Sequence, residues 1–311
     1  MEVISTIKLD DKYIKDMEKE GLSYQFVKTQ DLTEADKNKA EIMISYGVGD
    51  DFKNPEHYKN LKWLHVMSAG MDEIPKKMYE DKIVTNSSGI HKIQMSEYAV
   101  GLLLQFYKNL NRAYENQKKH FWESTLKSEE LYDKTVYILG TGNIGKRLAK
   151  LLTAFDTHVI GFNTSGREVE YFEKTLPIKE LKNNIKEADI VINILPSTED
   201  TRGMLDIDMF NSMSNEAVFL NIGRGDIMTD ETMIHVLKNK LIRHMLLDVF
   251  NEEPLEKDSP FYEFDNITIT PHASSKTSEY IPRAYKIFKE NLEHFKNDEE
   301  MYNVVTFEKG Y

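Results

Sequence analysis

The sequence has 311 residues, 40% hydrophobic and 30% charged, as expected of a globular protein of about two domains at roughly 150 residues each. Its 52 acidic and 40 basic residues give a net charge of −12, which argues against nucleic acid or an anionic membrane surface as the main partner. The chain contains no cysteine, which excludes disulfides, thiolate metal sites and cysteine nucleophiles. No signal peptide or membrane-spanning apolar run is visible, so a cytoplasmic location is expected.

The first part of the chain alternates short apolar runs with amphipathic segments, which predicts a mostly parallel α/β sheet. Helices are expected at Asp11–Glu20 and Pro55–Asn60. The predicted strands are Val3–Leu9, Tyr24–Lys28, Ile42–Ser45, Trp63–Met67 and Lys82–Thr85.

A long helix is predicted over Met95–Lys119, because apolar residues recur there at every fourth position and Ser96 is suited to cap its start. A second series of strands follows, with helices that include Ile144–Phe155, and the last predicted helix is Thr277–His294. These strands are Thr135–Leu139, His158–Phe162, Ile190–Ile194, Ala217–Ile222, His244–Asp248 and Ile267–Thr270. The chain is therefore expected to form two α/β units, with the long helix between them.

The turn between the first strand and the first helix of the second series has the pattern GxGxxG, at Gly140, Gly142 and Gly145. The first glycine permits a tight turn, the second lets backbone N–H groups approach a pyrophosphate, and the third allows the helix to pack closely on the strand. Asn143 and Ile144 lie at the predicted helix start, where unpaired N–H groups attract anions. A dinucleotide is the expected ligand, although S-adenosylmethionine is an alternative at this point.

The next strand ends where dinucleotide-binding folds that select NAD usually place an acidic residue against the ribose. This chain has Asn163, Thr164, Ser165 and Arg167 there instead. Hydroxyl groups and an arginine suit a 2′-phosphate, so the segment favours NADP over NAD. Glu168 and Glu170 weaken that preference, because they add negative charge nearby.

Four ionisable residues follow apolar strands later in the chain, namely Arg224, Asp248, Glu253 and His272. Ligands of open α/β sheets bind beyond the carboxyl ends of the strands. Four such residues at successive strand ends therefore predict a functional site.

These segments together resemble the D-isomer-specific 2-hydroxyacid dehydrogenase family, in consistent order from about residue 60 to 275. Among family members, the non-acidic strand end is most similar to glyoxylate/hydroxypyruvate reductases. The shared motifs are SAGMD (Ser68–Asp72), NSSGIHKIQMSEYAVGLLL (Asn86–Leu104), GTGNIG (Gly140–Gly145), LPSTEDTRG (Leu195–Gly203), NIGRGD (Asn221–Asp226), LDVFNEEPL (Leu247–Leu255) and TPHAS (Thr270–Ser274).

The resemblance implies two doubly wound parallel-sheet domains, with a Rossmann cofactor domain inserted into a flavodoxin-like substrate domain. The expected division is residues 1–94 and 279–311 for the substrate domain and 95–278 for the dinucleotide-binding domain. The implied activity is hydride transfer between NAD(P)H and a small 2-oxo acid such as glyoxylate, hydroxypyruvate or a short branched acid.

The family pattern assigns catalytic roles to Arg224, Glu253 and His272. An arginine can bind the carboxylate and polarise the carbonyl of a 2-oxo acid. A histidine can act as general acid and base, and a neighbouring carboxylate favours its imidazolium form. Asp248 resembles a residue that contacts the nicotinamide carboxamide, with structural capping as the alternative.

Further residues are expected to contact ligands. Backbone groups of Ala69 and Gly70 are candidates for the substrate carboxylate, beside Arg224 and His272. His91 is a weaker candidate to approach substrate. The expected cofactor contacts are Gly140, Gly142, Asn143, Ile144, Gly145, Asn163, Thr164, Ser165, Arg167, Leu195, Pro196, Ile222 and Asp248.

The family resemblance also implies a homodimer that uses the long helix. The apolar candidates for its interface are Phe106, Tyr107, Leu110, Tyr114, Phe121 and Trp122, with burial inside one chain as the alternative. For Trp122 alone, core packing is the preferred interpretation. No spacing of His, Asp or Glu indicates a metal site.

Two other functions stay open on sequence grounds. A dinucleotide-sensing corepressor of the same fold can retain the same residues. A formate dehydrogenase would need no proton donor and is usually longer.

Overall fold

The computed structural model describes residues 1–68, 70, 71 and 73–307, and it divides the chain into two compact units. One unit is His91–Lys276, and the other joins Met1–Ile90 to the segment that begins at Thr277. These boundaries lie a few residues before the expected divisions at 94/95 and 278/279. Among the described residues, no helix combines the length and apolar character needed to cross a membrane.

The unit that contains the N-terminus is built on a parallel sheet with the strand order β2-β1-β3-β4-β5. Alternate residues of each strand point to opposite faces, so Trp63 and Leu64 enter separate apolar cores. Helices α1 (Asp11–Lys19) and α9 (Tyr280–Lys296) contribute to the core around Trp63. The strands are β1 (Glu2–Ser5), β2 (Ser23–Phe26), β3 (Ile42–Ser45), β4 (Trp63–Val66) and β5 (Ile83–Asn86), and α2 (Glu34–Lys39) lies between β2 and β3.

The last described segment covers the outer edge of β5. Val304 forms an antiparallel bridge with Thr85, and the Val305 N–H donates to the Val84 carbonyl at 2.9 Å. An edge strand otherwise exposes unpaired backbone groups. The C-terminal segment thus pairs part of the edge that β5 presents.

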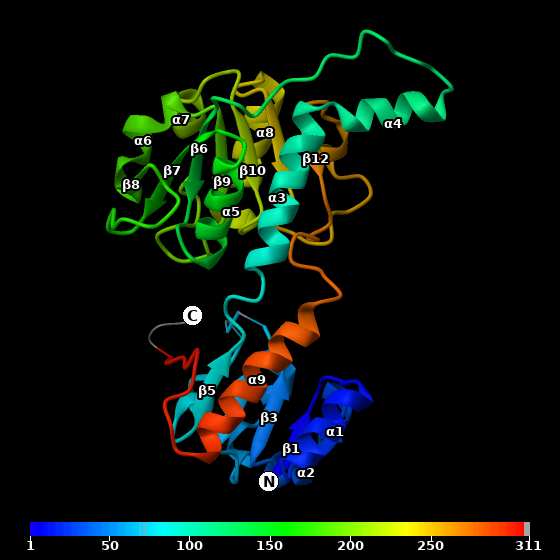
Figure 1. The fold of residues 1–311 in the computed structure, drawn as a ribbon, viewed down its shortest axis with the longest axis vertical. Helices are drawn as coiled ribbons and strands as arrows, with labels where there is room; N and C mark the ends of the chain where they lie inside the picture. Colours follow the sequence, from blue (N-terminus) through cyan, green and yellow to red (C-terminus); the bar gives the residue numbers. More distant parts are fainter. Residues whose placement is uncertain (69, 72, 308–311) are drawn as a thin grey trace. The chain divides into compact units, whose positions relative to one another are not determined.

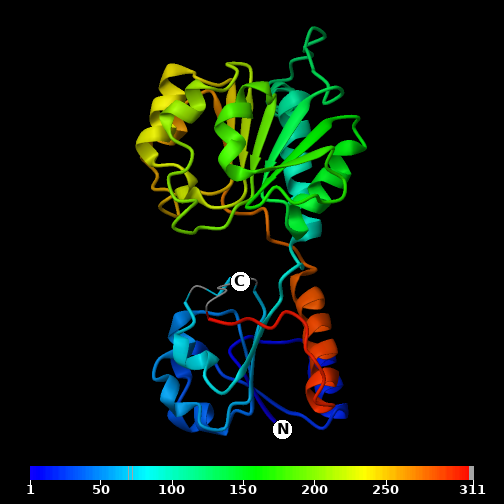
Figure 2. The same ribbon diagram turned by 90° about the vertical axis from the view of Figure 1, so that its left-hand side faces the viewer.

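The second unit is a parallel sheet with the order β12-β11-β10-β9-β6-β7-β8, in which the strand order reverses beside β6, as in dinucleotide-binding folds. Helices lie on both faces of this sheet (Figures 1 and 2). The helices α3 (Lys92–Tyr107) and α5 (Asn143–Thr153) share one core, and α6 (Leu181–Asn184), α7 (Ile207–Asn211) and α8 (Asp230–Asn239) share the other. The strands are β6 (Thr135–Leu139), β7 (His158–Asn163), β8 (Lys174–Pro177), β9 (Ile190–Asn193), β10 (Val218–Asn221), β11 (His244–Leu247) and β12 (Ile267–Ile269).

The long helix predicted over Met95–Lys119 is wrong in its bounds and its continuity. It is two helices, α3 and α4 (Leu110–Lys118), because Asn109 between them is in the left-handed region with φ 52°. Ser96 does not cap α3, which begins at Lys92, and the Ser96 hydroxyl donates to the Lys92 carbonyl within the helix at 2.6 Å. The helix predicted over Pro55–Asn60 is only a short 3₁₀ turn, Pro55–His57.

Candidate active site

The turn after β6 brings strand and helix into direct contact. Gly140 is in the left-handed region at φ 106°, and the chain then enters α5 at Asn143. A Cβ added to Gly145 would lie 2.0 Å from the Gly140 carbonyl oxygen, so only glycine allows this approach of helix to strand.

The first turn of α5 fits an anionic dinucleotide. Gly142 precedes the helix and has no side chain to cap the N–H groups of the first turn. A Cβ at Gly142 would meet nothing within 4 Å, and Gly142 and Asn143 are exposed while Ile144 is partly buried. Open space beside N–H groups at a helix start is what a pyrophosphate requires.

The loop after β7 is shaped by Asn163, whose side chain turns inward and is 9% exposed. Its Oδ1 accepts from the Gly166 N–H at 2.6 Å, and its Nδ2 donates to Thr141 Oγ1 at 3.1 Å and to the Arg167 carbonyl at 2.9 Å. Thr164, Ser165 and Arg167 are exposed. Asn163 therefore shapes the loop, and its three neighbours are the residues whose side chains are available to a ligand.

The negative charge near this loop is partly compensated. Glu170 forms an ion pair with Lys146 of α5 at 2.7 Å. The hydrogen bond from the Lys146 ammonium holds the pKa of the Glu170 carboxyl below its usual value. The pair reduces the net negative charge that faces an anion beside the loop.

The carboxyl ends of β9 and β10 lead into the segments that hold Leu195, Pro196, Ile222 and Arg224. Leu195 and Pro196 lie directly after β9 and are at least partly exposed. The Ile222 side chain is 1% exposed and belongs to the core, so only its backbone can face a ligand. Arg224 is exposed, and its Nη1 donates to the Gly223 carbonyl at 2.9 Å.

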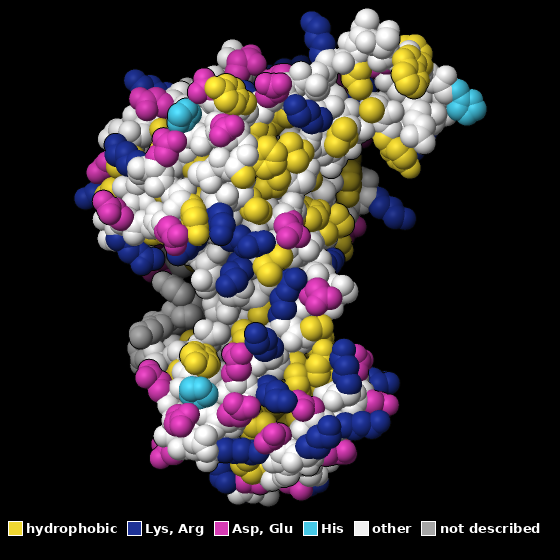
Figure 3. All heavy atoms as spheres, viewed as in Figure 1, with side chains coloured by type: hydrophobic (Ala, Val, Ile, Leu, Met, Phe, Trp, Pro, Cys, Tyr) yellow, Lys and Arg dark blue, Asp and Glu magenta, His cyan; other side chains and the backbone are white. Residues whose placement is uncertain are grey.

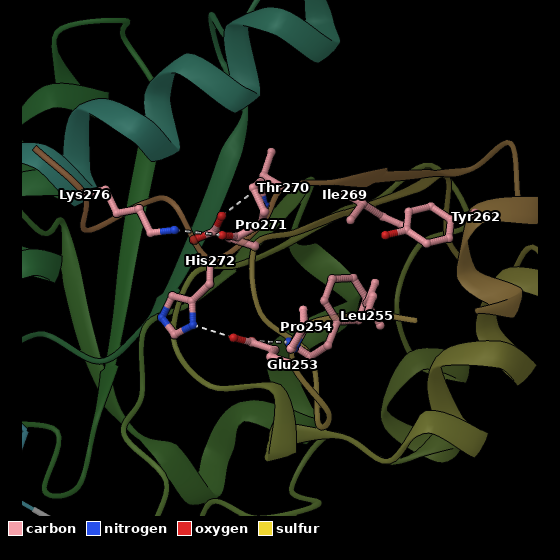
Figure 4. A pocket seen from close by; sticks show the side chains of 11 residues that line it. Glu253, Pro254, Leu255, Tyr262, Ile269, Thr270, Pro271, His272 and Lys276 are labelled. Atoms are coloured by element: carbon pink, nitrogen blue, oxygen red, sulfur yellow. Dashed lines mark hydrogen bonds and ion pairs between the residues drawn. The ribbon is translucent and has the colours of Figure 1, made fainter. Parts of the chain in front are cut away.

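His272 and Glu253 form a pair on the loops that follow β12 and β11 (Figure 4). His272 Nδ1 lies 2.7 Å from Glu253 Oε2, and Glu253 Oε1 accepts from the Phe250 N–H at 2.9 Å. A pocket of about 340 Å³ adjoins the pair, and its apolar wall includes Leu255, Tyr262 and Ile269. The Nδ1 contact orients the ring and leaves Nε2 outside this hydrogen bond.

Asp248 is fully buried and organises the loop that carries His272. Its Oδ1 accepts from Thr270 Oγ1 at 2.6 Å and the Ala273 N–H at 2.9 Å, and its Oδ2 accepts from the Ser274 N–H at 2.8 Å. The His272 N–H donates to the Asp248 carbonyl at 2.8 Å. These contacts give Asp248 the structural capping role that the sequence left as an alternative.

His91 lies near Arg224. Burial lowers the pKa of the His91 imidazole, and the positive charge of Arg224 lowers it further. This proximity places His91 at the same sheet edge as the other candidate residues.

In the N-terminal unit the loop after β4 holds Ser68 and Gly70. The Ser68 hydroxyl lies 2.8 Å from the Tyr46 carbonyl and 3.0 Å from the Gly70 carbonyl. Gly70 is exposed. Ala69, the other expected substrate contact of this loop, lies outside the described residues.

More than half of the chain matches a model of one known protein family. The family model described as "D-isomer specific 2-hydroxyacid dehydrogenase, NAD binding domain" matches residues 100–274. The chain belongs to the D-isomer-specific 2-hydroxyacid dehydrogenase family. It is accordingly an NAD(P)-dependent oxidoreductase, and the matched residues fall within the His91–Lys276 unit.

Several members of the dehydrogenase family are similar over most of their length. The glyoxylate reductase of Thermofilum pendens is 29% identical over 241 residues, 75% of this chain and 71% of that protein. A family member of known structure from Aeromonas salmonicida has a TM-score of 0.86 at 27% identity and covers 98% of this chain and 99% of its own. The NADPH-dependent glyoxylate/hydroxypyruvate reductase of Sinorhizobium meliloti, solved with NADP and sulfate, has a TM-score of 0.80 at 25% identity, with 100% of this chain and 99% of that chain covered.

Within the His91–Lys276 unit, the strands bring the predicted residues to one edge of the sheet. Because β6, β7, β9, β10, β11 and β12 are parallel, the loops at their carboxyl ends share that edge. Sequence reasoning missed two buried asparagines there, Asn193 and Asn221, and it missed Tyr98, which lies against Thr270 and Asp248. Polar residues that end apolar strands were the available signal.

Proposed function

We propose that this enzyme reduces a small 2-oxo acid to the D-2-hydroxy acid with NADPH, and that glyoxylate and hydroxypyruvate are its preferred substrates. The observation that carries the proposal is the 2.7 Å contact between Glu253 and His272, at the sheet edge that also presents Arg224. The similarity to glyoxylate and glyoxylate/hydroxypyruvate reductases supports the choice of substrate.

The proposed chemistry assigns one role to each side chain. Arg224 binds the substrate carboxylate and polarises the carbonyl. A reduced nicotinamide, when bound, would supply the hydride. His272 donates the Nε2 proton to the carbonyl oxygen while carbon 2 is reduced, and it regains a proton from water after the hydroxy acid leaves. Glu253 accepts a hydrogen bond from His272 Nδ1 and so orients the ring.

The preference for NADPH rests on the loop after β7. Thr164, Ser165 and Arg167 are exposed, and no acidic side chain ends the strand. A guanidinium and two hydroxyls match a 2′-phosphate, and Lys146 partly offsets Glu170. The family relative from Sinorhizobium meliloti was solved with NADP.

We further propose a homodimer that uses the segment from α4 to Leu126. Tyr114 and Phe121 are more than half exposed and Trp122 is 91% exposed, so the expected core packing of Trp122 is wrong. Hydrophobic side chains gather on this projecting segment (Figure 3). Apolar area of this kind is typical of an interface with another chain. A second copy of the protein is the proposed occupant, by analogy with the family.

Activity is tested with the full chain and a panel of 2-oxo acids that includes glyoxylate, hydroxypyruvate, pyruvate and a short branched acid. Loss of the reduced-nicotinamide absorbance band is followed with NADPH and with NADH. Turnover is expected to be fastest with glyoxylate or hydroxypyruvate and NADPH. Tight NADPH binding without turnover of any acid would refute the reductase proposal and favour a dinucleotide-sensing binding protein.

A further inference from the structure

The two neighbouring strands β9 and β10 both end in asparagine. Asn193 and Asn221 are paired across the parallel ladder and are both 0% exposed. Buried amides must satisfy their hydrogen bonds inside the protein, so their partners show what they hold in place.

Each asparagine first caps its own strand. Asn193 Oδ1 accepts from the Leu195 N–H at 3.1 Å, and Asn221 Oδ1 accepts from the Gly223 N–H at 3.0 Å. Because a backbone N–H can only donate, these contacts fix which side-chain atom is oxygen. Both amide nitrogens therefore point away from these N–H groups.

The amide nitrogens connect the two loops in series. Asn193 Nδ2 donates to Asn221 Oδ1 at 2.9 Å, and Asn221 Nδ2 donates to the Arg224 carbonyl at 2.9 Å. The series begins at Leu195, in the loop expected to contact cofactor, and ends at the backbone of Arg224.

The same two loops are in close steric contact at Gly223. A Cβ at this position would lie 2.8 Å from the Leu195 carbonyl oxygen and 2.9 Å from Asn193 Nδ2. Farther along, Ser197 Oγ donates to Asp226 Oδ2 at 2.5 Å. With so little room between them, neither loop can shift without disturbing the other.

We propose that Asn221 is a positioning residue for Arg224, and that its hydrogen bond with Asn193 couples the cofactor loop to Arg224. The inference rests on the proposed function, in which Arg224 binds the 2-oxo acid. Cofactor bound against Leu195 then orders the loop that presents Arg224. By linkage, each ligand strengthens binding of the other by the same factor.

The test uses Asn193→Ser and Asn221→Ser in the full-length protein. A serine hydroxyl can still accept from the N–H two residues on, but it is too short to replace the bond from Asn193 Nδ2 to Asn221 or the bond from Asn221 Nδ2 to the Arg224 carbonyl. Asn291→Ser is the matched control, because Asn291 is a buried amide that holds the Tyr302 backbone in the other unit, at 2.7 and 3.0 Å. Thermal unfolding of the three variants measures how much stability each loses when a buried asparagine is replaced by serine.

The decisive measurement is the affinity for oxamate, an unreactive 2-oxo acid analogue, with and without saturating NADPH. We expect NADPH to tighten oxamate binding in the wild type, and we expect Asn193→Ser to reduce this enhancement at least about fivefold. Asn221→Ser is expected to raise KM for glyoxylate at least about tenfold with a threefold or smaller change in NADPH Kd, while Asn291→Ser keeps kcat and KM within about twofold. Isosteric Asn221→Asp and Asn193→Asp replace any serine variant that fails to fold.

Failure of the inference is separable from failure of the proposed function. If Arg224→Lys leaves kcat and KM unchanged, the role proposed for Arg224 is wrong. If Arg224→Lys impairs the enzyme but the two serine variants behave like Asn291→Ser, the positioning role of the asparagines is wrong. If NADPH does not change the affinity of the wild-type protein for oxamate, the proposed coupling is also wrong.

Discussion

Glu253 holds His272 through one carboxylate oxygen and its own loop through the other. Oε2 lies 2.7 Å from His272 Nδ1, and Oε1 accepts from the Phe250 N–H at 2.9 Å. The backbone contact fixes the carboxylate, so the carboxylate in turn fixes the orientation of the imidazole ring. In the proposed reaction, proton transfer at His272 Nε2 would therefore depend on Glu253, a residue that need not touch the substrate.

Replacement of Glu253 by glutamine tests this dependence. The amide introduced by Glu253→Gln can still accept from the Phe250 N–H, but a neutral amide is a weaker hydrogen-bond acceptor for His272 Nδ1 than a carboxylate. We expect kcat for the preferred 2-oxo acid to fall roughly 10²-fold with little change in KM. Steady-state kinetics provide the measurement, with Glu252→Gln as a control at the adjacent exposed carboxylate. Equal losses in the two variants would contradict the pairing role.

His272 is best tested with asparagine rather than alanine alone. The residue is in the left-handed region at φ 46°, which asparagine tolerates better than most residues. His272→Asn is expected to lower turnover about 10²- to 10⁴-fold while the NADPH Kd changes by a factor of about three or less. His272→Ala should show the same division between turnover and binding. A parallel loss of activity and NADPH affinity would indicate a structural or cofactor-binding histidine.

Charge reversal at Arg167 tests cofactor selection. Arg167→Glu removes a charge-assisted contact to a 2′-phosphate, so kcat/KM for NADPH is expected to fall about 10- to 100-fold, with a change of about threefold or less for NADH. Lys238→Glu on α8 makes the same change in net charge away from the loop. A higher kcat/KM with NADH than with NADPH in the wild type would refute the NADPH preference.

Trp122→Asp tests the proposed dimer. A charge in a desolvated interface disfavours association, so sedimentation should shift toward monomer at concentrations where the wild type is dimeric. Tyr132→Asp is the control, because Tyr132 is also an exposed aromatic residue, at 65%. A monomeric wild type, or unchanged association of Trp122→Asp, would contradict the assignment of this interface.

Stability at mildly acidic pH should depend on His65. The side chain is completely buried, with Nδ1 2.8 Å from Thr85 Oγ1, and burial lowers its pKa to about 3 from 6.5. Below pH 6.5 the unfolded chain takes up a proton that the folded protein does not, so stability present above that pH is lost as pH falls. The loss attributable to His65 is about 2 kcal/mol between pH 7 and pH 5.

Urea unfolding at the two pH values measures this loss. His65→Gln cannot take up the proton and should show a weaker pH dependence than wild type. The exposed His120→Gln is the control and should retain the wild-type dependence. Equal slopes for wild type and His65→Gln would contradict the prediction.

Apolar patterning was sufficient to locate most of the strands. In β6, Val136 and Ile138 enter one core while Tyr137 and Leu139 enter the other, and this double burial produces a continuous apolar run. The edge strand β8 was missed, because Lys174–Pro177 has only one large apolar side chain and ends in proline. The break at Asn109 was also missed, because the apolar spacing continues through it.

The pairing of Glu253 with His272 was predicted from the sequence, and the structure brings the two side chains to 2.7 Å. The catalytic roles of Arg224, Glu253 and His272 stay predictions. The direction in which a side chain points depends on tertiary packing, and the spacing of residues along the sequence does not predict it. Asn163 was expected to face cofactor but turns inward, and Asp248 uses both carboxylate oxygens within its own unit. Asn193 and Asn221 were missed for the same reason, although both lie inside the predicted strands Ile190–Ile194 and Ala217–Ile222.

The C-terminal segment that pairs with β5 imposes an order on folding during synthesis. The ribosome releases residues 91–276 before α9 and the Val304 bridge, which complete the core and edge of the first unit. The core of the N-terminal sheet therefore stays incomplete in this interval, because Trp63 still lacks its stacked partner Phe288. The inserted unit can already form. A nascent chain stalled in this interval would expose an unpaired strand edge and an uncovered aromatic core. Chaperones bind such surfaces, and the same surfaces promote aggregation.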